Sequence, residues 1–136
     1  MQQLVHKLHS NPKALFLIDG LGACLTALLI AGILIPFQSV FGMPHFILEV
    51  GLLLALTMAV YSLCCSFFAK NNWRFFLKII LVSNSLYCCL IAFFVFYFFE
   101  KITTLGMIYF LVEIGVIAGL VMLEMKVVSV RNQIQE

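Results

Sequence analysis

Residues 14–35, ALFLIDGLGACLTALLIAGILI, form an apolar stretch of 22 residues that contains one charged side chain, Asp19. An α-helix rises about 1.5 Å per residue, so a stretch of this length can cross the roughly 30 Å hydrocarbon core of a bilayer. Three more apolar stretches of 23 to 25 residues follow, at residues 45–69, 75–99 and 103–125. The sequence therefore predicts an all-α membrane protein with four transmembrane helices.

The overall composition supports a membrane protein and argues against a soluble domain. Hydrophobic residues make up 64% of the 136 residues and charged residues 10%, whereas about a quarter of the residues in soluble domains are charged. The net charge of +2 comes from scattered basic residues without a run, so we expect the lipid bilayer as a partner and no nucleic acid. We expect a cytoplasmic N-terminal segment at residues 1–13, a transmembrane domain at 14–127 and a cytoplasmic tail at 128–136.

The basic residues also predict an orientation. All but one of the eight lie before the first predicted helix, around the second connection or after the fourth helix: Lys7, Lys13, Lys70, Arg74, Lys78, Lys126 and Arg131. The positive-inside rule then places both termini and the second connection in the cytoplasm. Because the second and third connections are short, neighbouring helices must be antiparallel. The sequence thus predicts a four-helix antiparallel transmembrane bundle with both termini cytoplasmic.

Small residues recur at every fourth position on three of the predicted helices. Burial of apolar area does not drive helix association in lipid, whereas close packing of small residues does. The residues in these stripes are Ala23, Ala27 and Ala31 in the first helix, Gly51, Ala55 and Ala59 in the second, and Gly115 and Gly119 in the fourth. We expect them to be contact faces inside the bundle, and the alternative for any one of them is a homo-oligomer contact.

Polar side chains inside the predicted spans are candidates for function, because they are costly in a bilayer. Glu113 lies near the middle of the fourth helix, and Asn84 and Tyr87 lie near the middle of the third. We expect Glu113 to face the amide and the phenol. This arrangement either locks two helices together or binds a proton or a cationic or polar ligand. Asp19, about 8 Å from the cytoplasmic end of its helix, is a further candidate on the same route.

Two more charged residues lie close to the cytoplasmic ends of their predicted helices. Lys78 and Glu124 are at nearly the same depth as Asp19, so an Asp19–Lys78 or a Lys78–Glu124 ion pair is feasible. Our preferred interpretation is that Lys78 and Glu124 extend their charged groups to the interface and hold the bundle in register.

The sequence contains no catalytic or metal-binding signature, so we expect no metal and no cofactor. There is no H-E-x-x-H, nucleophile elbow or phosphate loop and no C-x-x-C among the five cysteines. The cysteines are expected to pack as small apolar residues, and a membrane thiol-redox pair is the alternative. They are Cys24, Cys64, Cys65, Cys88 and Cys89.

Four segments carry a resemblance to a known group of proteins: FLIDGLGA at residues 16–23, FGMP at 41–44, the Tyr61-Ser62 pair and NSLYCC at 84–89. Together they resemble a group of small, uncharacterised bacterial four-helix integral membrane proteins. The resemblance covers nearly the whole chain. It implies a multi-pass protein of the bacterial inner (cytoplasmic) membrane, and it implies no activity.

Three function classes follow from these patterns. The leading hypothesis is a non-enzymatic assembly or accessory subunit that pairs with itself or with another membrane protein through its small-residue stripes. The first alternative is a small transporter or channel with a polar path through Glu113, Asn84 and Asp19. The second alternative is a membrane thiol-redox or lipid-modifying enzyme.

Overall fold

The fold is given by a computed structural model, which describes residues 2–130. Within these residues it is all-α, with four helices that are long and apolar enough to cross a membrane. The elements are α1 (Gln2–Ser10), α2 (Pro12–Leu29) with a π-helical continuation η1 (Ile30–Leu34), α3 (Gln38–Phe41), α4 (His45–Phe68), α5 (Trp73–Tyr97) and α6 (Thr104–Ser129). The prediction of a four-helix membrane protein is confirmed.

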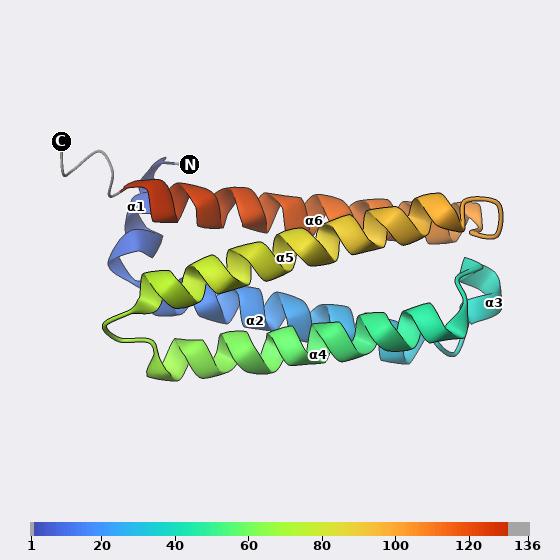
Figure 1. Ribbon diagram of the computed structural model, residues 1–136, viewed down its shortest axis with the longest axis horizontal. Helices are drawn as coiled ribbons and strands as arrows, with labels where there is room; N and C mark the ends of the chain where they lie inside the picture. Colours follow the sequence, from blue (N-terminus) through green and yellow to red (C-terminus); the bar gives the residue numbers. More distant parts are fainter. Residues whose placement is uncertain (1, 131–136) are drawn as a thin grey trace.

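The four long helices lie side by side along the long axis of the molecule (Figure 1). They pack in two pairs, because α2 contacts α4 extensively and α5 contacts α6, whereas contacts between the pairs are sparse. We call the boundary between the α2–α4 pair and the α5–α6 pair the seam. The α4–α5 connection lies at the same end of the bundle as α1 and the last turn of α6 (Figure 1). Which side of the membrane this end meets stays a prediction from the basic residues.

The helix ends follow the local sequence. Asn11 precedes α2 and Pro12 is its first residue, and the Asn11 side chain makes no capping hydrogen bond. At the opposite end of the bundle, α3 ends at Gly42, whose φ is +76°. The Thr103 hydroxyl accepts a bond from the Gly106 amide at 3.2 Å and donates to the Val40 carbonyl at 2.5 Å. These bonds attach the α3 segment to the start of α6.

Two apolar clusters fill the two ends of the bundle. The α1-end cluster consists of Val5, Leu8, Leu15, Phe16, Cys65, Ala69, Leu77, Ile80 and Val127. The α3-end cluster consists of Ile30, Leu34, Phe41, Met43, Leu48, Tyr87, Ile91, Val95, Ile102 and Phe110. The short helix α1 therefore packs Val5 and Leu8 against the bundle. The buried polar side chains of Asp19, Ser62, Asn84 and Glu124 lie on the long helices between these clusters.

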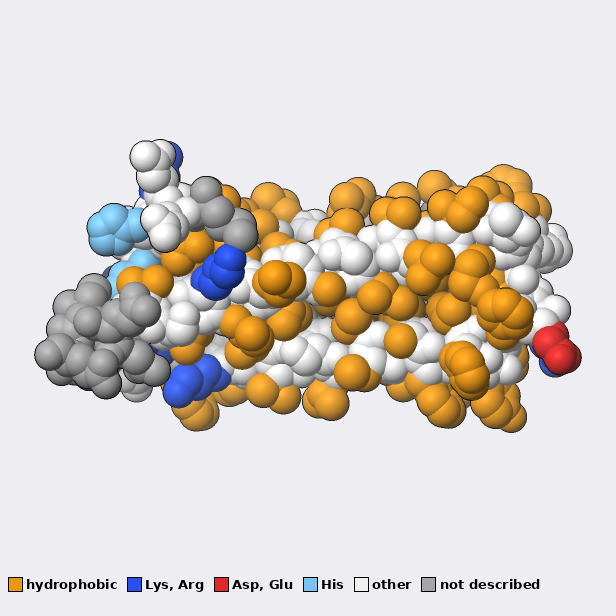
Figure 2. Space-filling view, turned by 90° about the horizontal axis from the view of Figure 1, so that it is seen from above, with side chains coloured by type: hydrophobic (Ala, Val, Ile, Leu, Met, Phe, Trp, Pro, Cys, Tyr) orange, Lys and Arg blue, Asp and Glu red, His pale blue; other side chains and the backbone are white. Residues whose placement is uncertain are grey.

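Large apolar side chains cover the outside of the helices along most of their length (Figure 2). On the face shown, lysine, arginine and histidine side chains gather near the α1 end, and an acidic group lies at the other end. An exposed apolar surface of this extent would favour aggregation in water, but it suits a protein surrounded by lipid. The surface thus supports lipid contact along all four spans.

Candidate functional site

Each long helix contributes one buried polar side chain to a common cluster, which we call the polar node. Its members are Asp19 from α2, Ser62 from α4, Asn84 from α5 and Glu124 from α6. Their exposed fractions are 4%, 0%, 9% and 0%. The node is therefore shielded from the surroundings by the helices that form it.

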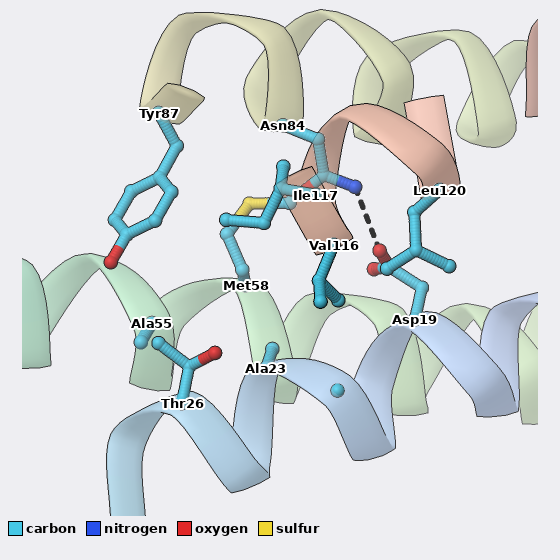
Figure 3. A pocket seen from close by; sticks show the side chains of 11 residues that line it. Asp19, Ala23, Thr26, Ala55, Met58, Asn84, Tyr87, Val116, Ile117 and Leu120 are labelled. Carbon is cyan, nitrogen blue, oxygen red and sulfur yellow. Dashed lines mark hydrogen bonds between the residues drawn. The ribbon is translucent and has the colours of Figure 1, made fainter. Parts of the chain in front are cut away.

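The Asn84 amide connects the two carboxyl groups of the polar node. Its Nδ2 donates to Asp19 Oδ1 at 2.7 Å, as Figure 3 shows, and to Glu124 Oε1 at 3.4 Å. The Ser62 hydroxyl donates to the second Asp19 oxygen, Oδ2. Asp19 and Glu124 therefore both accept from the same amide group. In residues 2–130, the buried Glu124 Oε2 has no hydrogen-bond partner.

Close packing of α2 on α4 brings Ser62 to Asp19. Gly20, next to Asp19, faces α4 so tightly that a Cβ atom there would lie 2.9 Å from Leu63 Cδ2. Small buried residues on α4 continue this contact away from the polar node: Gly51, Ala55 and Ala59. A larger residue at these positions would hold the helices apart and separate the Ser62 hydroxyl from the carboxylate.

A second polar pair lies on α5 and α6. The Tyr87 hydroxyl donates to Glu113 Oε1 at 2.9 Å, and Glu113 is 8% exposed. The other carboxyl oxygen, Oε2, is buried without a hydrogen-bond partner in the described part of the chain. The expected contact between Glu113 and Tyr87 is therefore present.

The expected contact between Asn84 and Glu113 is not formed, because Asn84 bonds to Asp19 and Glu124 instead. Glu113 and Glu124 are eleven residues apart on α6, which corresponds to about 16 Å along the helix. One short asparagine side chain can reach only one of them. Sequence reasoning placed one polar core in the membrane, and the structure has two.

A cavity of about 60 Å³ lies in the seam between the polar node and Tyr87. Its polar walls are Asp19, Thr26, Asn84 and Tyr87, and its apolar walls are Gly22, Ala23, Ala55, Met58, Val116, Ile117 and Leu120. Figure 3 shows these side chains converging from all four long helices. A cavity of this size with several polar groups has room for about one or two water molecules.

The buried acids have no basic partner among residues 2–130. Lys78 is exposed and forms no ion pair with Asp19 or Glu124 in this part of the chain, whereas His45 and Glu49 form an ion pair at 3.2 Å on the surface. The expectation that Glu124 extends its carboxylate to the interface is wrong, because its side chain is fully buried. Counting from a helix end at residue 125 underestimated its depth, since α6 continues to Ser129.

The remaining predicted packing residues divide between the interior and the surface. Ala27 is buried and Ala23 is half-buried at the cavity, whereas Ala31 is exposed. Ala31 lies in the π-helical segment that begins at Ile30. A π-helical turn contains more residues than an α-helical turn, so the i, i+4 step from Ala27 no longer keeps Ala31 on the same face of the helix. Gly115 and Gly119 are also exposed, and a Cβ atom at either would meet no described atom within 4 Å.

The five cysteines lie at different degrees of burial in the described chain. Cys65 is buried, Cys24 and Cys88 are half-buried, and Cys64 and Cys89 are exposed on the helix surfaces, all as free thiols. Across residues 2–130, no group of three or more histidine, cysteine, aspartate or glutamate side chains is placed to hold a metal ion.

Sequence reasoning did not identify Ser62 as a member of the polar node, and it placed Glu124 at the interface. A helix turns every 3.6 residues, so a buried face continues with steps of three as well as four. A step of three from Ala59 on the α4 stripe reaches Ser62, which is buried in the structure. Extending the fourth helix beyond residue 125 would have moved Glu124 into the membrane.

Comparisons of the chain with protein-family models, curated proteins and solved structures found no match. The four candidate spans support the architecture that the resemblance implies, without identifying a family.

Proposed function

We propose that this protein is a small membrane transport protein that binds a monovalent cation at the polar node. One observation supports this proposal most directly. Three buried carboxyl groups, on Asp19, Glu113 and Glu124, have no buried lysine or arginine near them in residues 2–130. An ionised carboxylate inside a bilayer is costly unless a positive charge offsets it. A bound cation or proton would supply that charge.

The position of the polar node also suits transport. It lies between the α1-end and α3-end apolar clusters, so its polar groups are closed off from both ends of the bundle. Transporters expose a bound ion to each side of the membrane in turn by moving one group of helices against another. The sparse contacts across the seam, compared with those inside each pair, support the two helix pairs as the moving parts.

The test is an ion-flux measurement on the full-length protein in liposomes under imposed gradients of H⁺, Na⁺ and K⁺. The wild type should move one of these ions faster than protein-free liposomes do. Asp19→Asn and Glu124→Gln should reduce the flux to the protein-free level, because they keep the side-chain shape and remove the charge. Glu49→Gln is the matched control and should retain the flux, since the Glu49 side chain is 59% exposed. Absence of wild-type flux, or unchanged flux in Glu124→Gln, would show that the proposal is wrong.

A second candidate function is an assembly subunit, which one observation favours. The G-x-x-x-G of α6 faces outward, where Gly115 and Gly119 leave room for another helix to approach. On this hypothesis, Gly119→Leu should abolish either self-association or the binding of a membrane partner. Native gels would show the loss of the corresponding complex. Val82→Leu on the exposed face of α5 should not have this effect. A wild-type protein that stays monomeric and copurifies with no other protein would contradict this candidate.

A further inference from the structure

The hydrogen bonds in the polar node suit a proton better than a metal cation. The Asp19 oxygens accept from the Asn84 Nδ2 group and the Ser62 hydroxyl. These donors direct their hydrogens at lone pairs of the Asp19 carboxylate oxygens. A metal ion would need the same lone pairs to be free for coordination. Two carboxyl groups that accept from one amide nitrogen, as those of Asp19 and Glu124 do, are stabilised by one shared proton, because two adjacent carboxylates repel each other.

The cavity in the seam connects the polar node to Tyr87. Asp19 and Asn84 lie at one side and Tyr87 at the other, with Thr26 between them (Figure 3). A buried water needs about two to four polar partners. The Asp19 carboxyl, the Thr26 hydroxyl and the Tyr87 hydroxyl can provide them in a cavity of about 60 Å³.

Tyr87 in turn connects the cavity to Glu113. The hydroxyl of Tyr87 reaches across the seam to within 4.0 Å of a Cβ atom built at Gly51 on α4, and it donates to Glu113 Oε1 at 2.9 Å. Glu113 and Glu124 are separated by about 16 Å along α6. The polar groups between them therefore cover about half of the roughly 30 Å hydrocarbon core.

We infer that the transported ion is a proton, and that it passes from the Asp19–Glu124 pair through cavity water and the Tyr87 hydroxyl to Glu113. This inference rests on the proposed transport function and identifies its ion. Asp19 releases a proton to water, and the water gives a proton to the Tyr87 oxygen. At the same time Tyr87 releases its own hydroxyl proton to the Glu113 carboxylate. One O–H bond breaks at Asp19 and one forms at Glu113, while Tyr87 and the water are restored.

The experiment measures proton influx into liposomes that contain the full-length protein and a pH-sensitive dye, with a potassium diffusion potential as the driving force. Tyr87→Phe removes the hydroxyl from the relay and should lower the proton flux on the order of 100-fold, the usual contribution of a positioned acid–base group. Tyr61→Phe is the control and should conduct like the wild type. Its hydroxyl is also buried, but it makes no hydrogen bond in the described chain and lies outside the relay.

A second pair of variants tests the cavity itself. Ala23→Leu places a larger side chain where the water should be and should also lower the flux, whereas Ala31→Leu on the exposed face of the same span should not. Circular dichroism and size-exclusion chromatography confirm that each variant is folded. If Tyr87→Phe is misfolded, the Ala23 and Ala31 variants decide the question.

The outcomes separate this inference from the proposed function. Wild-type flux in Tyr87→Phe and Ala23→Leu, combined with loss of flux in Glu124→Gln, would overturn the relay and leave transport intact. Movement of Na⁺ or K⁺ without H⁺ would overturn the proton assignment alone. A wild-type protein that moves none of these ions would overturn both.

Discussion

Replacing Asn84 with alanine should destabilise the bundle, because this amide connects α5 to α2 and α6. The side chain donates at 2.7 Å to Asp19 and at 3.4 Å to Glu124. Hydrogen bonds between transmembrane helices contribute about 0.6 kcal/mol on average and up to about 1.7 kcal/mol. We assign a value near the upper limit to the short bond and about 0.5 kcal/mol to the long one. Asn84→Ala should therefore lower the free energy of unfolding by about 2 kcal/mol.

The assay is reversible unfolding of the purified protein in mixed micelles, with helix content as the readout. Ser85→Ala is the matched control, because the Ser85 hydroxyl donates only to the Leu81 carbonyl within its own helix, at 2.8 Å. This control should change the free energy of unfolding by less than about 0.5 kcal/mol. An Asn84→Ala protein as stable as the Ser85→Ala protein would refute the claim that the node holds the helices together.

A double-mutant cycle makes the same test more specific. Asn84→Ala combined with Asp19→Ala should show a coupling energy of about 1 to 1.7 kcal/mol, because both changes remove the same hydrogen bond. Asn84→Ala combined with Glu113→Gln should be additive within about 0.5 kcal/mol, since these residues share no bond. Strong coupling in the second cycle would instead support the single polar core that the sequence suggested.

Three further predictions concern the ends of the bundle. Gly42→Ala should destabilise the protein by about 1 to 3 kcal/mol, because φ at Gly42 is +76° and a Cβ atom would lie 2.1 Å from a backbone oxygen. Gly32→Ala is the control and should leave the unfolding midpoint unchanged or higher, because a Cβ atom there would meet nothing within 4 Å. In a cysteine-free background, a membrane-impermeant thiol reagent should label Ser39→Cys from the outer side and Asn71→Cys from the cytoplasmic side, and labelling of both from one side would contradict the four-span topology. Leu8→Ala should loosen α1 and shift the fluorescence of the single tryptophan, and an unchanged spectrum would show that α1 does not depend on this contact.

Much of the fold was predictable because membrane thickness constrains it. A helix must be about 20 residues long to cross the hydrocarbon core, so the apolar stretches locate the spans without knowledge of their packing. Pairing of Tyr87 with Glu113 was also predictable, since both lie near the middle of adjacent antiparallel helices.

The polar node was harder to predict, because it depends on helix rotation and on the exact depth of each residue. Glu124 was placed at the interface because the fourth helix was ended too early. Asn84 was assigned to Glu113 because the two were counted to similar depths, whereas the structure places Asn84 beside Asp19 and Glu124. Ala31 was assigned to the packing face because a π-helical turn leaves no periodic signal in an apolar sequence.

The central claim is that the buried acids of the node carry a proton, and infrared spectroscopy of the protein in lipid tests it most directly. Protonated carboxylic acids have a carbonyl stretching band that is distinct from that of carboxylates and amides. The wild type at neutral pH should show this band, and Glu124→Gln should lose the part that belongs to the node, while Glu49→Gln should leave it unchanged. A wild-type spectrum without a protonated carboxylic acid, or one identical to that of Glu124→Gln, would contradict the account.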